Sequence, residues 1–384
     1  MLVRLTVLFC GALLVAMPSA SSAFETEATS ALVVDHGTGM VLFAKNEKEP
    51  LPPASMSKLM TLYMLFEAIR DGRVTKETEF DVSARANAMG GSRMFLEVGT
   101  TVPVDALIRG IIVQSGNDAC VVVAEGLAGT EGAFSEQMTR RARELGMEGT
   151  TLKNASGWPE TGHVMSAEDQ VELSRRIIEE FPEFYGYFAE TEFTWNGITQ
   201  ENRNPLLTLG IGADGLKTGH TQEAGYGLVG SAVQDGQRIV FKVSGLTSSA
   251  QRAAETASLV KWAFGAFDTV KFFAEGETVA EADVWLGEAA TVPMIAPVPL
   301  QMLVPREARD GITASIRYQG PVEAPVVAGQ KLGALVVEIP DGETVSFDLV
   351  AGADVPRGGL MTRINAAAHV ARDRVLEVLP GGDR

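Results

Sequence analysis

Residues 52–66 read PPASMSKLMTLYMLF, in which two prolines and a short polar turn precede a long apolar run. Prolines suit a turn that leads into a helix start, where backbone N–H groups are free, and the apolar run predicts a mostly buried helix. Positions i and i+3 of a helix share a face, so Lys58 can direct its amine at the hydroxyl of Ser55. A serine needs an adjacent base to become a nucleophile, and a lysine becomes a base when it is desolvated or lies beside another cation. The stretch therefore predicts a nucleophile and its base on one buried helix.

Two further elements follow this one in a fixed order. Ser115-Gly116-Asn117 gives S-x-N and Lys217-Thr218-Gly219 gives K-T-G, so the chain carries the three elements of active-site serine acyl transferases in working order. Ser258 and Lys261 repeat the first pattern, but neither of the other two elements follows them. We interpret this second pair as the solvent-facing side of a helix.

The S-x-N element supplies a hydroxyl and an amide. Ser115 can relay a proton to the leaving amine, and Asn117 can bind the backbone of a substrate. The alternative interpretation is a polar turn that caps the next helix.

The K-T-G element is expected on the edge of a strand. Lys217 brings a cation towards Lys58 and, with Thr218, can hold a substrate carboxylate. Gly219 would leave room for a substrate to lie alongside as an additional strand. His220 follows directly, and we expect it to orient its neighbours rather than to act as a base.

With these elements, the chain resembles the low-molecular-mass penicillin-binding proteins, specifically the serine-type D-alanyl-D-alanine carboxypeptidases. The resemblance covers about residues 25–355 and extends to the stretches GSRMFL at 91–96, SGNDAC at 115–120, NRN at 202–204 and DGLKTGHT at 214–221, and to Arg252 with Glu255. It implies that Ser55 is acylated, that Lys58 accepts its proton, that Ser115 completes the proton path and that Lys217 binds the substrate. Residues 84–92 look shorter than the loop typical of the best-known members, and that loop borders the active site.

The order of predicted elements indicates an α+β fold. Strands at 31–34 and 41–44 form a hairpin, helices follow at 57–70, 104–127, 133–145 and 167–179, and strands follow at 193–195, 216–218, 226–233 and 238–244 before a helix at 254–267. An antiparallel sheet flanked by helices satisfies this order and matches the β-lactamase/transpeptidase-like fold that the resemblance implies.

Beyond about residue 270 the pattern changes to short alternating strands, at 282–285, 300–304, 313–318, 332–339 and 344–349, with Asp-Gly and Gln-Gly turns between them. They predict a small all-β domain that serves as a spacer or stabilising module. The predicted domains are a catalytic domain at 24–268 and a β-rich domain at 275–356, between a leader at 1–23 and a tail at 357–384.

The leader has one early cation, Arg4, then an apolar run and small residues before residue 24. This is typical of a secretory signal peptide, with a membrane anchor as the alternative, and it predicts a periplasmic protein. Cleavage after residue 23 removes Cys10 and leaves Cys120, which we expect to be a buried thiol with no partner for a disulfide.

The tail predicts an amphipathic helix, with an apolar face formed by Leu360, Ile364, Ala368, Ala371, Val375 and Val378. The resemblance implies that such a helix lies on the inner-membrane surface. This face is rich in alanine, however, and docking on the protein itself or dimer formation is an equal alternative.

The chain has a net charge of −17, which argues against nucleic acid and against electrostatic binding to anionic lipid. Its four histidines are scattered singly and give no metal-ligand spacing, and we find no nucleotide-binding fingerprint, so no metal or cofactor is expected.

Together these observations predict a serine D-Ala-D-Ala carboxypeptidase that acts on the pentapeptide stems of peptidoglycan and is acylated by β-lactams at Ser55. The alternatives are a D,D-endopeptidase, a β-lactamase or a non-catalytic peptidoglycan-binding protein of the same fold. A related β-lactamase would need a glutamate shortly before a Leu-Asn pair, and here Glu172-Leu173 is followed by Ser174. Complete motifs argue against a mere binding protein.

Overall fold

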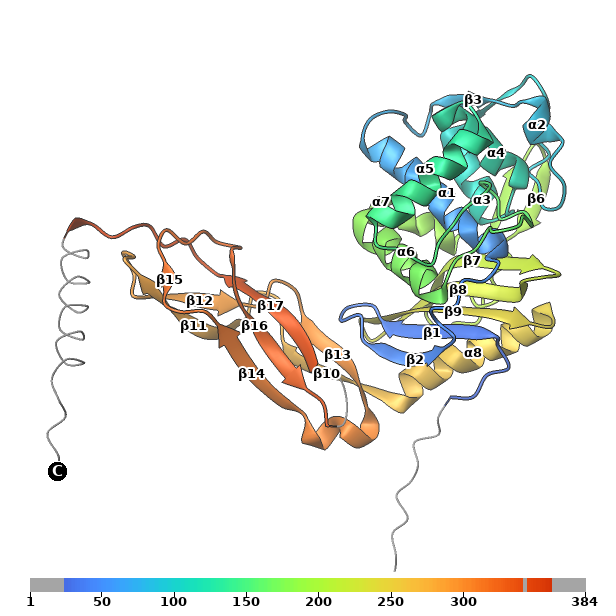
Figure 1. Cartoon of the computed structure of the whole chain (residues 1–384). Helices are drawn as coiled ribbons and strands as arrows, with labels where there is room; N and C mark the ends of the chain where they lie inside the picture. Colours follow the sequence, from blue (N-terminus) through green and yellow to red (C-terminus); the bar gives the residue numbers. More distant parts are fainter. Residues whose placement is uncertain (1–23, 341–343, 361–384) are drawn as a thin grey trace, which may run out of the picture.

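The computed structural model of the chain describes residues 24–340 and 344–360. Its centre is a five-stranded sheet with the order β2-β1-β9-β8-β7 (Figure 1). The strands are β1 (Ser30–Asp35), β2 (Val41–Lys45), β7 (Ala213–Thr221), β8 (Gly225–Gln234) and β9 (Gln237–Leu246), and every neighbouring pair is antiparallel. The predicted antiparallel sheet flanked by helices is confirmed.

The two faces of the sheet pack against different helices because side chains alternate along each strand. Ala31, Val33 and Phe241 lie in one apolar cluster with Leu259 and Val260 of α8 (Ser249–Ala266). On the opposite face, Leu32, Val34 and Val240 pack on Ala167 and Val171 of α6 (Ala167–Glu180). β7 ends the sheet, and its outer edge carries no further strand in the described part of the chain.

A helical region lies beside the sheet on the α6 side (Figure 1). Its helices are α1 (Lys58–Arg70), α2 (Ala84–Asn87), α3 (Val104–Ile112), α4 (Asn117–Ala128), α5 (Glu131–Glu144) and α7 (Pro182–Tyr185), followed by the 3-10 turn η2 (Gly186–Ala189). Two small hairpins accompany them, β3 (Glu79–Asp81) with β4 (Thr101–Pro103) and β5 (Glu192–Trp195) with β6 (Ile198–Glu201). The apolar face of α1 is buried in this core, as its run of large side chains predicts.

The expected continuous helix at 104–127 is wrong. α3 ends at Ile112 and α4 begins at Asn117, and between them Ser115 adopts a φ of 59°. Two backbone bonds hold this break open: a local one, in which Gly116 N donates to Gly110 O at 2.9 Å, and a long-range one, in which Asn117 N donates to Ser92 O at 2.8 Å. The bond to the distant Ser92 loop therefore outweighs the local helix propensity of these residues and interrupts the helix.

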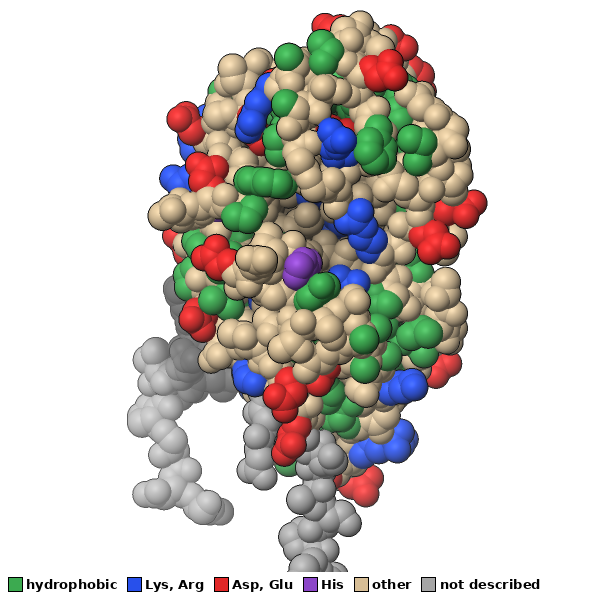
Figure 2. All heavy atoms as spheres, turned by 90° about the vertical axis from the view of Figure 1, so that its right-hand side faces the viewer, with side chains coloured by type: hydrophobic (Ala, Val, Ile, Leu, Met, Phe, Trp, Pro, Cys, Tyr) green, Lys and Arg blue, Asp and Glu red, His purple; other side chains and the backbone are tan. Residues whose placement is uncertain are grey.

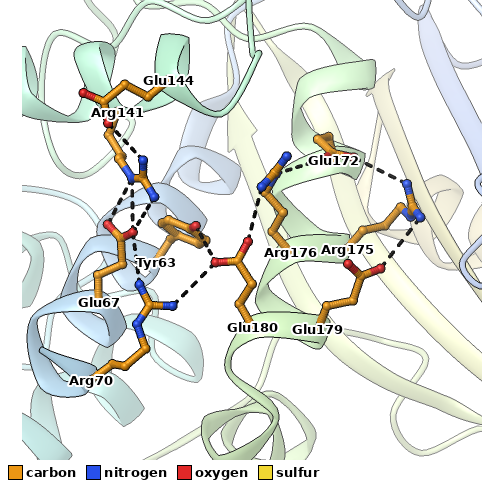
Figure 3. A network of polar contacts seen from close by, with 10 residues as sticks. All are labelled: Tyr63, Glu67, Arg70, Arg141, Glu144, Glu172, Arg175, Arg176, Glu179 and Glu180. Carbon is orange, nitrogen blue, oxygen red and sulfur yellow. Dashed lines mark hydrogen bonds and ion pairs between the residues drawn. The ribbon is translucent and has the colours of Figure 1, made fainter. Parts of the chain in front are cut away.

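Charged side chains join three of the helices on the surface (Figure 3). The network comprises Tyr63, Glu67 and Arg70 from α1, Arg141 and Glu144 from α5, and Glu172, Arg175, Arg176, Glu179 and Glu180 from α6. The guanidinium of Arg141 binds Glu67 at 2.7 Å, and the Tyr63 hydroxyl donates to Glu180 at 2.8 Å. These contacts fix α5 and α6 against the helix that begins at Lys58.

The C-terminal strands form a separate elongated body to one side of the sheet (Figure 1). β10 (Phe267–Phe273) pairs with β13 (Leu300–Pro305), and six strands follow the order β14-β16-β17-β12-β11-β15. Their bounds are β11 (Thr278–Trp285), β12 (Thr291–Ile295), β14 (Thr313–Tyr318), β15 (Val322–Glu323), β16 (Lys331–Glu338) and β17 (Thr344–Ala351), with the 3-10 turn η3 (Arg306–Gly311) after β13. The predicted β-rich region is confirmed, while β10, β12 and β15 were not predicted. The exact domain boundaries stay predictions.

The predicted signal peptide at 1–23 and nearly all of the predicted tail helix lie outside the described residues. Within the described residues, we find no helix with the length and apolar character needed to cross a bilayer.

Candidate active site

Ser55 lies in a short 3-10 turn, η1 (Ala54–Ser57), that leads directly into α1. Two cavities meet at this residue. The tryptophan cavity has a volume of about 580 Å³ and is lined by Ser55, Gly91, Ser92, Asn117, Ser156, Gly157, Trp158, Pro159, His220, Thr221, Gln222 and Glu223. The cationic cavity has a volume of about 650 Å³ and is lined by Ser55, Gly91, Ser92, Ser115, Arg203, Thr218, Gly219, His220, Tyr226, Ser249 and Arg252. A hollow with lysine or arginine and histidine side chains at its border is visible on this face of the molecule (Figure 2).

Lys58 is buried at the start of α1, and its amine reaches three oxygen atoms. Lys58 Nζ lies 2.8 Å from Ser55 Oγ and 2.8 Å from Asn117 Oδ1, and it also contacts the backbone carbonyl of Ser156. The sequence prediction that Lys58 points at Ser55 is therefore matched by the geometry. The pKa of Lys58 is lowered from 10.5 to about 8, chiefly by burial and also by the positive charge of Arg203, while Cys120 and Asp118 oppose this shift.

Lys217 lies on β7 and is also buried. Its Nζ donates to the carbonyl of Thr218 at 3.2 Å. Burial lowers the pKa of Lys217 well below its ordinary value, and repulsion from Lys58 and Arg203 adds to this. From the sequence we expected Lys217 to be the cation that lowers the pKa of Lys58. In the structure the positive charge of Arg203 also lowers it, and the sequence did not indicate this role for Arg203.

The S-x-N element lies in the break between α3 and α4. Ser115 is 2 % exposed and, like Ser55, lines the cationic cavity. Asn117 begins α4; its Nδ2 donates to Gly90 O at 2.8 Å, which directs its Oδ1 at Lys58. The helix-cap alternative does not apply to Ser115, because Gly116 occupies the N-cap and makes no side-chain cap bond.

The K-T-G element lies on β7, the edge strand, as predicted. Thr218, Gly219 and His220 line the cationic cavity. A Cβ on Gly219 would meet Met56 Cγ at 3.0 Å and the carbonyl of Pro53 at 3.2 Å. The glycine therefore lets the nucleophile turn pack closely on β7, which is a different reason from the room for substrate that the sequence suggested. The His220 ring is exposed and stacks on Tyr226 at 3.8 Å.

The loop at residues 154–158 completes the site, and the sequence reasoning missed it. Asn154 Oδ1 accepts from the backbone N–H of Ser156, Gly157 and Trp158 at 3.2, 2.8 and 3.0 Å. Gly157 has a φ of 77°, and a Cβ there would lie 1.9 Å from the carbonyl oxygen of Ala54. Asn154 and Gly157 thus hold the loop in the position where the Ser156 carbonyl contacts Lys58. In the sequence, the Asn-Ala-Ser-Gly run at 154–157 was the feature that could have indicated this loop.

Other candidate groups lie outside the two cavities. Ser258 and Lys261 are exposed on α8, as interpreted from the sequence. Cys120 is buried, and burial raises the pKa of its thiol to about 12. Lys242 on β9 is buried, and its Nζ donates to Ser30 Oγ at 3.0 Å and to Ser244 Oγ at 2.6 Å.

Comparison with known proteins identifies the family of this chain. Residues 17–247 match the D-alanyl-D-alanine carboxypeptidase family, and residues 267–357 match the C-terminal domain family of penicillin-binding protein 5. The D-alanyl-D-alanine carboxypeptidase DacD of Escherichia coli is 36% identical over 355 residues, which are 90% of this chain and 91% of that protein.

Solved structures give the same result. The crystal structure of penicillin-binding protein 5 from Haemophilus influenzae has a TM-score of 0.76 at 32% identity, covering 87% of this chain and 98% of that chain. Penicillin-binding protein D2 from Listeria monocytogenes in its ampicillin-bound form has a TM-score of 0.57 at 30% identity, covering 62% of this chain and 97% of that chain. The chain therefore belongs to the D-alanyl-D-alanine carboxypeptidase family.

Proposed function

We propose that the D-alanyl-D-alanine carboxypeptidase activity of this family is carried here by Ser55, Lys58, Ser115 and Lys217. The substrate is a peptidoglycan stem peptide that ends in D-Ala-D-Ala, and the products are free D-alanine and the shortened peptide. The observation that carries the proposal is the set of three oxygen atoms around Lys58 Nζ.

Two of these three atoms are carbonyl oxygens, which accept hydrogen bonds and cannot donate them. A neutral lysine amine has two N–H donors and one lone pair. If both donors go to Asn117 Oδ1 and to the Ser156 carbonyl, the lone pair is left for the Ser55 hydroxyl at 2.8 Å. A protonated Lys58 would donate to all three atoms. The same arrangement therefore fits the lysine before and after it takes the serine proton, so little reorganisation is needed.

The acylation step follows from this geometry. Ser55 Oγ attacks the carbonyl carbon of the penultimate D-alanine while its proton moves to Lys58. Backbone N–H groups near Ser55 and His220 stabilise the oxyanion. The C–N bond then breaks, the leaving amine takes a proton by way of Ser115, and an ester on Ser55 remains. Water attacks this ester, gives a proton to Lys58 and releases the peptide, and Ser55 regains its proton.

The cationic cavity is proposed to hold the terminal carboxylate. Arg203 and Arg252 line it, Lys217 lies buried beside it, and Thr218 offers a hydroxyl. A bound carboxylate stabilises the charged form of Lys217. Repulsion between the two lysines then favours neutral Lys58, so substrate binding itself promotes the base.

Product analysis tests the proposal. A pentapeptide that ends in D-Ala-D-Ala should yield free D-alanine, and a crosslinked peptide dimer should stay intact. A split dimer would instead favour the endopeptidase alternative. Benzylpenicillin should add its mass to Ser55, as seen by peptide mass spectrometry, and absence of any adduct would overturn the acyl-enzyme.

We further propose that the protein acts in the periplasm and that residues 358–384 make weak, reversible contact with the inner membrane. Deletion of these residues should move the protein from the membrane fraction to the soluble fraction with unchanged activity on a small peptide. Equal fractionation of the two forms would assign the tail to packing or self-association.

A further inference from the structure

Charge is divided unequally between the two cavities that meet at Ser55. The cationic cavity presents Arg203 and Arg252. Among the described residues that line the tryptophan cavity, Glu223 is the charged one, and the remaining polar lining is neutral. A ligand that extends across Ser55 thus passes from a positive environment into one with an aromatic ring and a carboxylate.

The aromatic ring is held rigidly. Trp158 is 45% exposed, yet both its backbone groups are fixed by one side chain: Asn154 Oδ1 accepts from its N–H at 3.0 Å, and Asn154 Nδ2 donates to its carbonyl at 2.9 Å. Its ring lies on the loop at Gly90 and Gly91, where a Cβ on either glycine would come within 3.2 Å of the ring. The absence of side chains there lets the indole lie against the loop with much of its surface open to solvent.

An exposed indole and a carboxylate in one cavity form a recognisable pair. The face of a tryptophan attracts a cation, and its apolar surface packs on methylene groups. A carboxylate such as Glu223 forms an ion pair with an ammonium group. Together they suit an aliphatic chain that ends in a primary ammonium, and neither a neutral nor an acidic side chain would use both.

We infer that Trp158 and Glu223 form a specificity subsite for a side chain with a free terminal amine, located on the acyl side of the scissile bond. This inference rests on the proposed function, because the cationic cavity then holds the terminal carboxylate and the tryptophan cavity is left for the part of the peptide before the penultimate D-alanine. The preferred substrate carries a carboxylate at its end and a basic diamino acid before its two D-alanines.

Two matched peptides test this subsite. Nα-acetyl-L-lysyl-D-alanyl-D-alanine carries the free amine, and Nα,Nε-diacetyl-L-lysyl-D-alanyl-D-alanine lacks only its charge. Release of D-alanine gives kcat/KM for each. We expect the wild-type protein to prefer the free amine about five- to tenfold, and we expect added salt to reduce the preference because both groups are solvent-exposed.

Variants separate the ring from the carboxylate. Glu223→Gln should lower kcat/KM for the free amine about two- to fivefold and leave the acetylated peptide unchanged. Trp158→Leu should reduce the preference similarly, whereas Trp158→Phe should keep part of it because a ring remains. Glu281→Gln removes an exposed carboxylate on β11 of the C-terminal body and serves as the control for net charge.

The outcomes distinguish this inference from the proposed function. No D-alanine from either peptide would overturn the proposed function itself. Equal release from both peptides by the wild-type protein, or a preference that Glu223→Gln and Trp158→Leu leave intact, would overturn the subsite alone. Penicillin labelling of Ser55 should be unchanged in both variants, which shows that the catalytic groups remain in place.

Discussion

Two lysines of this protein are buried among serine hydroxyls, and they differ in their other neighbours. Lys58 Nζ contacts Ser55 Oγ at 2.8 Å, while Lys242 Nζ contacts Ser30 Oγ at 3.0 Å and Ser244 Oγ at 2.6 Å. Burial is the first cause of a lowered pKa in both, to about 8 for Lys58 and about 7 for Lys242. By pKa alone, a larger fraction of Lys242 than of Lys58 is neutral at pH 7 and free to accept a proton.

The difference lies in access and in the acceptors. Ser55 lines both cavities, whereas Ser30 and Ser244 line neither of them in the described part of the chain. Lys58 has two carbonyl acceptors that use its donors, but the partners of Lys242 are hydroxyls that can donate or accept. A lowered lysine pKa beside a serine is therefore not enough for catalysis; an open hydroxyl and an oriented lone pair are also required.

The largest effect is expected for the two serines. Ser55→Ala should abolish D-alanine release and penicillin labelling while the protein stays folded, because the hydroxyl is the attacking atom. Ser30→Ala should keep both activities and lower the free energy of unfolding by about 1–3 kcal/mol, because Lys242 loses a buried partner. Mass spectrometry and chemical denaturation measure these outcomes, and label on another residue of Ser55→Ala would refute the assignment.

The next largest effects are expected for the lysines, whose variants should differ in kcat/KM. Lys58→Arg should lower kcat/KM by about 10²–10⁴-fold, because arginine does not give up its proton. Lys217→Arg should keep part of the activity, since a cation that holds a carboxylate is partly replaceable, and Lys242→Met should stay within about twofold of wild type. Similar losses in Lys58→Arg and Lys217→Arg would contradict the division of roles.

The pH profile provides a companion test. Lys58 must be neutral to accept the proton, so wild-type kcat/KM should rise with pH up to about pH 8. A profile that is flat between about pH 6 and pH 9 would show that Lys58 is not the titrating base.

Titration of Lys242 should instead affect the pH dependence of the free energy of unfolding. Its folded pKa of about 7 lies below its ordinary 10.5, so between these values the unfolded chain binds more protons and stability rises with pH. Below about pH 7 the folded state bears the cost of a buried charge. Lys242→Met should therefore gain most in unfolding free energy near pH 6, by up to a few kcal/mol relative to pH 10, with each pKa unit contributing about 1.4 kcal/mol. A gain that does not depend on pH would mean that Lys242 is not desolvated.

The smallest effect is expected for Cys120, a third potential nucleophile. Because it is buried and its thiol pKa is about 12, iodoacetamide should leave the native protein unmodified at about pH 8. Cys120→Ala should keep penicillin labelling and cost about 1 kcal/mol of stability. Rapid alkylation of the native protein would contradict this prediction and would show that the core around Cys120 opens to solvent.

The sequence predicted the parts of the site that depend on side-chain type. The i, i+3 spacing of Ser55 and Lys58, the edge position of Lys217 and the flanked sheet all follow from periodicity and motif order. The Ser156 carbonyl could not be predicted in the same way, because a backbone oxygen carries no signature in the residue type. Its position depends on Asn154 and on the close contact at Gly157.

Long-range contacts explain the remaining differences. The break at Ser115 needs the bond from Asn117 N to the Ser92 carbonyl in a distant loop, which local helix propensity does not contain. Lys242 carries no signal of burial in the sequence, because its Ser30 partner comes from a strand about two hundred residues earlier. Burial of a lysine becomes visible only when these strands pair.

The carbonyl acceptors of Lys58 bear on how such a protein could evolve drug tolerance. On the proposed mechanism, a β-lactam and a stem peptide are both attacked by the Ser55 hydroxyl, and in both reactions the lone pair of Lys58 accepts its proton. A mutation that moves Asn117 or the Ser156 loop to slow the drug would slow the natural reaction equally, so selection gains nothing there. Adaptive change is directed instead to those parts of the cavity walls where the two ligands differ in shape and charge. An inhibitor that depends on Lys58 and its two carbonyl acceptors is thus the one against which resistance mutations are least able to preserve the natural activity.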